Sequence, residues 1–326
     1  MSGGADSRPG DDWRPSASLE ALRLRARLLG AIRGFFAERA VLEVETPALA
    51  AAGASDPHIA SLVTRCQHGG RLYLQTSPEF AMKRLLAAGS GPIYQICRAF
   101  RDGESGRLHN AEFTLLEWYR PGFDHHALMD ELDALVDRLL GTAPDNRRLS
   151  YREAFVAHAR LDPFAASTSE LRACAADAGL ELASVPRGER DMLLDFIFSH
   201  CVQPEFTEGR VYIHDFPASQ AALARLRAGD PPLAERFELF VNGIEIANGY
   251  HELTDADEQG RRFAADGRVR ERRGLEPMPT DARLLAALAH GMPACAGVAV
   301  GLDRLFMIAA GERSIEAVMA FPTARA

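Results

Sequence analysis

The segment ICRAFRDGESGRLHNAEFTLLEWYRP, residues 96–121, joins strand-like alternation to polar side chains that a buried sheet rarely contains. The residues that could do chemistry there are Arg101, Arg107, His109, Asn110, Phe113, Glu117 and Tyr119. A guanidinium fork suits phosphate oxygens, an aromatic ring stacks on a base, and a carboxylate holds an ammonium group. Each residue alone has a structural interpretation. Together they indicate a site for a nucleoside triphosphate beside an amino acid.

A second constellation lies in ERFELFVNGIEIANGYHEL, residues 235–253, where Asn242-Gly243 is a strong two-residue hairpin turn. That turn predicts a register in which Glu238 faces Ala247. Glu238 and Glu245 then share one sheet face, roughly 7–8 Å apart along a diagonal, and can reach one hard cation. The alternative is an amphipathic hairpin whose polar face is in water. The apolar Ala247 on the same face argues against that alternative.

Hydrophobic periodicity predicts the helices and strands that position these residues. Helices are expected at 19–39, over most of 124–200, and in the arginine-rich segment after 252. The segment RLYLQTSPEF is expected to be a strand that enters a helix, with Ser77 as the N-cap and Pro78 at the first helical position. Strands are expected at 93–101, 112–119, 211–216 and 236–247, and a glycine-rich strand from Gly297 enters the last helix. We therefore predict an α+β fold on an antiparallel sheet, with residues 1–15 as a flexible tail and 16–326 as one domain.

Composition excludes several classes of protein. A net charge of -8 argues against a general nucleic-acid coat. The five cysteines form no C-x-x-C pair, so neither a disulfide framework nor a zinc site is indicated. The N-terminal eighteen residues lack the apolar core of a signal peptide, and Asp303 and Arg304 interrupt the longest C-terminal apolar run. A cytoplasmic protein with no membrane span is expected.

Three blocks in order resemble the signature motifs of class II aminoacyl-tRNA synthetases: RAVLEVETPAL with Pro47, FRDGESGRLHNAEFTLLEWY, and GVAVGLDRL with Arg304. The likeness is greatest to the lysyl-tRNA synthetase catalytic domain and covers about Ser16 to Ala326. The anticodon-binding OB-fold that precedes this domain in those enzymes is expected to be missing here. The resemblance therefore extends to stand-alone paralogues that attach (R)-β-lysine, or lysine, to a lysine of elongation factor P.

The resemblance also implies residue roles. Catalysis falls to Arg101 and Arg304, and the ATP site would comprise Arg101, Asp102, Gly103, His109, Asn110, Phe113, Glu245, Ile246, Gly301 and Arg304. The amino-acid pocket would comprise Ser77, Pro78, Glu79, Glu117, Tyr119, Asn248, Glu252 and Ala299, and magnesium would bind Glu238 and Glu245. In class II enzymes the Pro47 block forms a dimer interface, so a homodimer is expected.

Two positions depart from the family pattern. Members usually carry Glu two residues after the first motif arginine, where this chain has Gly103 followed by Glu104. Synthetases also carry Gly at the middle of the last motif, where this chain has Ala299. The added methyl group would reshape the pocket floor in a way that suits a β-amino acid.

The implied reaction is formation of an acyl-adenylate, followed by attack of an acceptor amine, with ATP and magnesium required. A minimal tRNA-lysylating enzyme, an ammonia-using asparagine synthetase and a non-catalytic amino-acid sensor remain alternatives. Six arginines, Arg261, Arg262, Arg268, Arg270, Arg272 and Arg273, form either a solvated helix face or a docking surface for an acidic acceptor protein. Lys83 is the only lysine beside 36 arginines. Genome composition explains that bias, and a shortage of amines would also protect the enzyme from its own adenylate.

Overall fold

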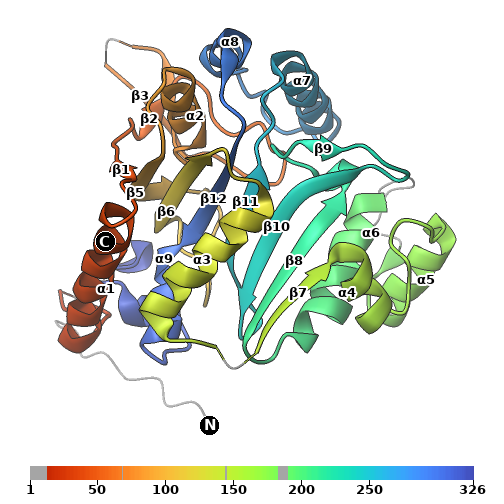
Figure 1. The fold of residues 1–326 in the computed structure, drawn as a ribbon, viewed down its shortest axis with the longest axis horizontal. Helices are drawn as coiled ribbons and strands as arrows, with labels where there is room; N and C mark the ends of the chain where they lie inside the picture. Colours follow the sequence, from red (N-terminus) through yellow and green to blue (C-terminus); the bar gives the residue numbers. More distant parts are fainter. Residues whose placement is uncertain (1–12, 68, 144, 183–189) are drawn as a thin grey trace.

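A nine-stranded sheet forms the centre of the computed structural model, which describes residues 13–67, 69–143, 145–182 and 190–326 (Figure 1). The strands in order across it are β1 (Leu42–Glu43), β5 (Ile93–Phe100), β6 (Glu112–Pro121), β12 (Cys295–Gly301), β11 (Ile244–His251), β10 (Leu233–Val241), β8 (Arg210–Pro217) and β7 (Asn146–Ser150), with β9 (Leu226–Arg227) beside β10. The predicted tail, residues 1–15, lies almost entirely outside the described residues.

The sheet is antiparallel except at its two edges. The outermost pairs, β1 with β5 and β7 with β8, run parallel. Parallel neighbours need a long crossover, and the chain supplies one in each case. Between β1 and β5 this crossover contains a small sheet of β2 (Leu49–Ala50), β4 (Arg71–Leu74) and β3 (Val63–Arg65). The predicted α+β class on an antiparallel sheet is confirmed, and the parallel pairs are confined to the two edges.

Helices cover both faces of the sheet. In the described residues they are α1 (Leu19–Ala37), α2 (Glu79–Ala87), α3 (His125–Leu140), α4 (Tyr151–His158), α5 (Thr168–Asp177), α6 (Arg190–Ile197), α7 (Ala256–Arg272), α8 (Ala282–Gly291) and α9 (Leu302–Ala309), with short 3₁₀ or π turns at 198–205, 218–220, 315–318 and 323–325. Ser18 caps α1 by accepting a hydrogen bond from the amide of Ala21 at 3.1 Å. None of these helices is long and apolar enough to cross a membrane. All five cysteines are free.

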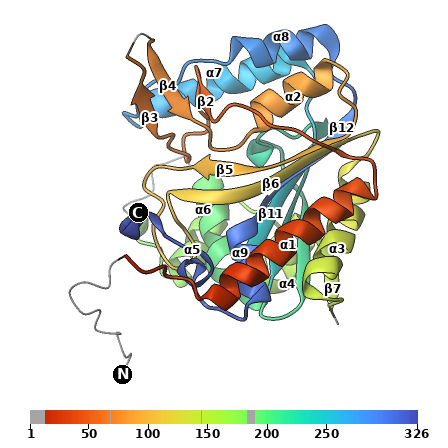
Figure 2. The ribbon, with the colours of Figure 1, turned by 90° about the vertical axis from the view of Figure 1, so that its left-hand side faces the viewer.

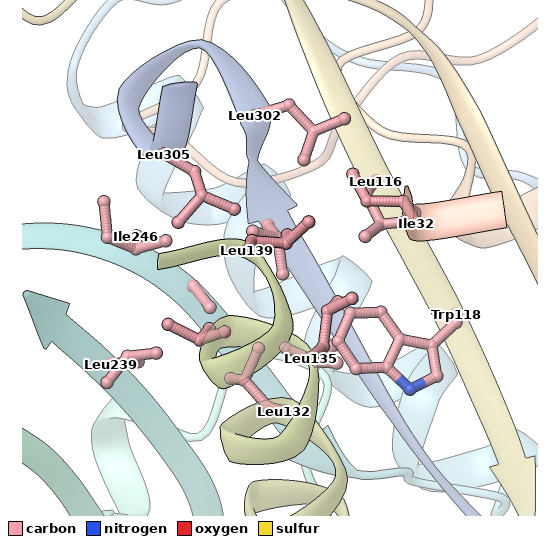
Figure 3. Packing of buried hydrophobic residues seen from close by; sticks show 14 of the residues in the cluster. Ile32, Leu116, Trp118, Leu132, Leu135, Leu139, Leu239, Ile246, Leu302 and Leu305 are labelled. Atoms are coloured by element: carbon pink, nitrogen blue, oxygen red, sulfur yellow. The ribbon is translucent and has the colours of Figure 1, made fainter. Parts of the chain in front are cut away.

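One face of the sheet packs against α1, α3 and α9 and forms the largest core cluster. Figure 3 shows Leu135 of α3 beside Trp118 of β6. Trp118 is fully buried, and its indole N–H donates to Glu131 at 3.0 Å. A buried tryptophan needs such a partner, because its ring nitrogen otherwise loses the hydrogen bond it had in water.

The opposite face carries two separate helical layers. Helices α2, α7 and α8 pack together above β5 and β6 (Figure 2). Helices α4, α5 and α6 form another cluster with β8 and Phe240 of β10. The two clusters leave the centre of this face, over β6, β12, β11 and β10, without a helix from either cluster. That uncovered centre is where side chains of the central strands remain available for chemistry.

The segment from 124 to 200 was expected to be mostly helical, and it contains one strand that the sequence did not reveal. β7 has the sequence NRRLS, extends the sheet parallel to β8, and is largely exposed. Its polar composition hides it, because period-two alternation appears only where one face of a strand is buried. The strand then passes directly into α4, where Ser150 and Glu153 form a capping box.

Candidate active site

A cavity of about 920 Å³ lies over the uncovered centre of the sheet. Every residue predicted for the amino-acid pocket lines it: Ser77, Pro78, Glu79, Glu117, Tyr119, Asn248, Glu252 and Ala299. Arg101 lines it as well. These residues come from β6, β11, β12 and the start of α2, so the fold gathers positions that lie more than 200 residues apart.

Behind the cavity wall lies a buried ion-pair cluster built around Lys83, whose partners Glu79 and Glu252 line the cavity. This side chain is 1 % exposed, and its Nζ lies 2.7 Å from Glu79 and 2.6 Å from Glu252. Burial by itself lowers the pKa of Lys83, but attraction to Glu252 and Glu79 outweighs burial and raises it, so the amine is protonated. The sequence analysis did not place Lys83 in the site. Its position four residues after Glu79 in a helix was the available signal, since that spacing aligns side chains on one face.

A third carboxylate, that of Glu117, lies in the same pocket. It accepts hydrogen bonds from the hydroxyls of Ser77 and Tyr119, each at 2.7 Å. Burial, with repulsion from Glu79, raises the pKa of Glu117 to about 7. Burial likewise raises the pKa of Glu252 to about 8, against the opposing attraction of Lys83. The pocket is therefore rich in carboxyl groups, and two of them, Glu117 and Glu252, lose their protons near neutral pH.

The entry to α2 differs by one residue from its predicted geometry. Pro78, not Ser77, occupies the N-cap position, and the helix begins at Glu79. The hydroxyl of Ser77 still accepts from the amide of Glu79 at 3.0 Å while it donates to Glu117. A hydroxyl can do both at once because it has one hydrogen and two lone pairs. Ser77 thus joins the helix start to the floor of the pocket.

The β10–β11 hairpin corrects the predicted register. Its turn pairs Val241 with Ile244 as expected, but a bulge next to the turn makes Glu238 face Asn248, where Ala247 was predicted. Ala247 belongs to the core on the other face. A bulge adds one residue to a strand and so shifts the alternation beyond it. That shift brings Asn248, together with Tyr250 and Glu252 further along the strand, to the cavity face.

Glu238 and Glu245 are near enough for the charge of Glu245 to act on Glu238. Burial raises the pKa of Glu238 to about 7, with Arg236 opposing the shift and Glu245 adding to it. Arg236 donates to Glu238, and its Nη1 donates to the carbonyl of Gln220 at 2.8 Å. Arg236 was missed by the sequence analysis. It lies two residues before Glu238 on a strand, and that period places both on one face.

The second half of the site lies along the β5–β6 loop and the start of α9. Arg304 donates to the carbonyl of Glu245 at 2.8 Å and to that of Leu108 at 3.2 Å, and its Nη2 is 2.7 Å from His109 Nε2. Burial and the charge of Arg304 lower the pKa of His109. His109 is therefore neutral at pH 7 and accepts from the guanidinium.

Arg101 extends this cluster toward the cavity. Its guanidinium lies 5.0 Å from the ring centre of Phe113 and 3.6 Å from the carboxylate of Glu104. Gly103 has a φ of +78°, a left-handed conformation that glycine adopts without a steric penalty. This turn places Glu104, rather than residue 103, beside Arg101.

Other residues predicted for the ATP site take different positions. The side chain of Ile246 is 3 % exposed and packs in the core on the far face, so only its backbone can contribute to a site. Asn110 donates to the carbonyl of Glu112 at 2.6 Å and accepts from the amide of Thr323, which ties the loop to the C-terminus. Asp102 and Gly301 do not line the cavity, although Gly301 is the N-cap residue of α9.

Comparison with known proteins adds an independent observation. A family model described as tRNA synthetases class II (D, K and N) matches residues 11–325. The chain belongs to this class II synthetase family. Family membership implies the use of ATP, and the buried carboxylates and convergent arginines described above are the features a class II site would need.

Individual relatives within the synthetase family are also similar over nearly their whole length. An elongation factor P (R)-beta-lysine ligase of Vibrio cholerae is 51% identical over 323 residues, which is 97% of this chain and 99% of that protein. A protein of the same name from Vibrio vulnificus is 50% identical, covering 95% of this chain and 98% of its own. One from Yersinia enterocolitica is 48% identical, covering 96% and 98%.

The arginine cluster of α7 is less uniform than the sequence suggested. Arg270 is 7 % exposed, and it donates to the carbonyls of Glu276 and Asp56 at 3.0 and 3.1 Å. Arg262 likewise donates to the carbonyls of Ala222 and Ala224. These two side chains hold the protein's own loops in place. Arg268 and Arg272 are exposed, and Arg272 lines the cavity.

Proposed function

We propose that this chain activates (R)-β-lysine, or lysine, with ATP as an acyl-adenylate and transfers the acyl group to a lysine side chain of elongation factor P. The similarity over nearly the full length of three ligases with that name is the observation that carries the proposal. The acidic pocket supports the substrate class on independent chemical grounds.

Charge balance in the pocket matches a diamino acid. With Glu79, Glu117 and Glu252 ionised and Lys83 protonated, the cluster carries two net negative charges. A β- or α-lysine brings two ammonium groups. A buried charge is costly unless paired, so binding the substrate relieves the excess negative charge and orients its carboxylate away from the three glutamates. Asparagine synthesis from aspartate would bring an anion into the same pocket, which this balance disfavours.

The residues around Arg101 and Arg304 suit the triphosphate. In the first half-reaction a carboxylate oxygen of the amino acid forms a bond to the α-phosphorus of ATP, and the bond to pyrophosphate breaks. The two guanidinium groups stabilise the negative charge on the phosphoryl oxygens, and Phe113 offers a stacking surface for adenine. In the second half-reaction an acceptor amine bonds to the acyl carbon, AMP leaves, and the amine loses its proton.

The pair Glu238 and Glu245 fits a magnesium ion. Burial, with a smaller contribution from repulsion by Glu245, raises the pKa of Glu238, and two such carboxylates are an oxygen donor set of the kind that magnesium prefers. Bound there, magnesium would neutralise the phosphate charge. Family members usually have a glutamate where this chain has Gly103, and that glutamate contacts the amino group of adenine. We assign this contact to Glu104 here.

Pyrophosphate exchange tests the first half-reaction. We expect exchange with (R)-β-lysine or lysine and none with aspartate, and transfer of the label to elongation factor P but not to a variant whose acceptor lysine is replaced by arginine. Exchange with lysine but transfer only to tRNA would favour the tRNA-lysylating alternative. Absence of exchange with every amino acid would leave the sensor interpretation.

A variant at the metal pair tests the ATP site. Glu245→Gln should reduce exchange by at least about 100-fold, because the lost charge weakens transition-state stabilisation by about 3 kcal/mol or more. Circular dichroism should be unchanged, since Glu245 is partly exposed. Near-normal exchange in the folded variant would contradict the assignment.

A further inference from the structure

A group of histidines lies on the sheet face opposite the cavity, where α3 begins. His125 and His126 are the first two residues of α3, and His214 comes from β8. His214 pairs with Phe237, whose side chain is in the core beneath α3, so both project to that face. Atoms of these three side chains that could ligate a metal all lie within 4.8 Å of one another.

The buried member of this group has no hydrogen-bond partner. His125 is 2 % exposed, and in the described part of the chain neither of its ring nitrogens makes a hydrogen bond. Burying such a polar group without a partner costs free energy, so natural proteins seldom leave one orphaned. The ring centres of His125 and His126 lie 4.1 Å apart, and those of His126 and His214 lie 5.3 Å apart. A metal ion bound by this cluster would give one ring nitrogen of His125 the partner that it lacks.

Asp215 lies behind two of the rings. Its carboxylate is 3.7 Å from His125 Nε2 and 3.3 Å from His214 Nδ1. Histidines that bind metals commonly present their second nitrogen to a carboxylate, which fixes the ring orientation. Arg227 holds Asp215 in this position with an ion pair of 2.8 Å.

Charges around the cluster act on His126 and on the neighbouring carboxylates. Burial, His125 and His214 all lower the pKa of His126. The nearby carboxylates are already paired, Asp215 with Arg227 and Glu235 with Arg225. Zinc binds imidazole in its neutral form.

We propose that His125, His126 and His214 form a divalent metal site, suited to Zn²⁺, that is separate from the catalytic cavity. Three histidine nitrogens with an open fourth position are a known zinc geometry, in which nitrogens about 2.0–2.1 Å from the ion lie about 3.4 Å apart. The candidate ligand atoms lie within 4.8 Å of one another, so binding an ion requires these side chains to rotate toward it. His126 is exposed, so an ion has a path from solvent.

Binding of Zn²⁺ to untagged protein, freed of metal by a chelator, tests the site. Competition with a chromophoric zinc indicator should give one ion per chain with a dissociation constant of about 1 μM or tighter. Co²⁺ should give the visible absorption of a tetrahedral site. His126→Asn and His214→Asn should each weaken binding by about tenfold or more. His290→Asn, which changes an exposed histidine of α8, should leave binding unchanged.

The competing triad and the folding controls complete the design. His125 also lies within 4.8 Å of Glu235 and His251, so loss of binding in His251→Asn but not in His126→Asn would overturn this ligand set. Binding only at millimolar Zn²⁺, or equal affinity in all variants, would overturn the site itself. His126→Asn should retain full pyrophosphate exchange and lose the rise in Tm that Zn²⁺ gives the unmodified protein. Retention of that rise would also contradict the proposal.

Discussion

Lys83 is buried behind the acidic pocket, and its ammonium group pairs with Glu79 and Glu252, which line that pocket. Its attraction to these carboxylates keeps the amine protonated and therefore non-nucleophilic. It is also the only lysine in the sequence. An acyl-adenylate formed in the cavity thus meets no reactive lysine amine of its own chain, and the acceptor amine must come from a partner.

Removal of this ammonium should destabilise the protein in a pH-dependent way. In Lys83→Met the buried carboxylates lose their counter-ion, so the free energy of unfolding should fall by about 3–5 kcal/mol at pH 8. The loss should be smaller at pH 5.5, where Glu252, with a pKa of about 8, carries a proton. Urea denaturation at both pH values measures the difference. Glu252→Gln in the same background should recover part of the stability, and equal losses at both pH values would argue against the ion-pair cluster.

Glu117 and Glu252 have raised pKa values of about 7 and about 8. Raising the pH through this range therefore has opposite effects on folding stability and on substrate binding. A carboxyl group whose folded-state pKa is raised contributes stability below its unfolded value of about 4.3, and that contribution is lost as pH rises through 7 to 8. The same rise produces the ionised carboxylates that hold ammonium groups. Unfolding should therefore become easier over the pH range in which lysine binds better.

This second effect gives a kinetic prediction. From about pH 6 to about pH 8.5, kcat/KM for lysine or β-lysine in pyrophosphate exchange should rise mainly through a falling KM, because the pocket must lose protons while the amines keep theirs. Glu117→Gln should remove the part of the rise that is centred near pH 7. A KM that is flat across this range would mean that the carboxylates are already ionised at pH 6.

At the scale of elements, helix α7 carries two kinds of arginine. Arg262 and Arg270 hold loops of the protein through backbone carbonyls, whereas Arg268 and Arg272 are exposed on an otherwise acidic molecule. Opposite charge between proteins accelerates their encounter and fixes orientation without much increase in affinity. The exposed pair is therefore the part of the helix that suits docking of an acidic acceptor.

Charge reversal at the exposed pair should separate the two half-reactions. Arg268→Glu with Arg272→Glu should slow acyl transfer to elongation factor P by roughly tenfold at low salt, with the difference shrinking as salt rises. Pyrophosphate exchange should be unchanged in the single variant Arg268→Glu, which is the reference for exchange because Arg272 lines the cavity and Arg268 does not. As a structural comparison, Arg270→Gln should lower Tm and both rates, because it frees the carbonyls of Asp56 and Glu276. Unchanged transfer in the double variant would identify an ordinary solvated surface.

At the scale of the whole molecule, one edge of the sheet remains poorly covered. β1 is an edge strand of two residues, and Leu42 on it is 56 % exposed. Leu49 of β2 and Val63 of β3 are 44 and 43 % exposed. The labels of these three strands follow one another along the same side of Figure 1. Exposed apolar side chains gathered near a sheet edge are typical of a protein–protein interface, so we propose that this side forms a two-fold dimer.

The oligomeric mass tests that proposal. Light scattering at micromolar concentration should give about twice the 35.6 kDa of one chain. Leu42→Glu with Val63→Glu should shift the mass toward that of the monomer, because charges placed in an apolar interface must lose water without gaining partners. Val156→Glu, at a position on α4 that is 51 % exposed, is the matched control and should remain dimeric. A fully active monomer would contradict the dimer.

Local sequence patterns were sufficient to predict most elements, whereas the pocket residues were predicted from the resemblance to class II synthetases. The apolar spacing of α1, the alternation of β5 and β6, and the Asn242-Gly243 turn are interactions between near neighbours in the chain. The polar residues of β6 were recognisable because a sheet interior has no packing use for them. These features depend on backbone geometry within a few residues, so a short stretch of sequence is enough to predict them.

Tertiary structure alone decided how distant residues meet. The bulge in β11 places Asn248 on the cavity face, a shift that follows from packing Ile246 and Ala247 together into the core and not from the turn. The meeting of Lys83 with Glu252, and of His125 with His214, joins elements far apart in the chain. Such contacts depend on the strand order and on helix placement, which burial of the whole apolar surface determines. No short stretch of sequence contains that information, because the free energy that selects it is spread over the entire core.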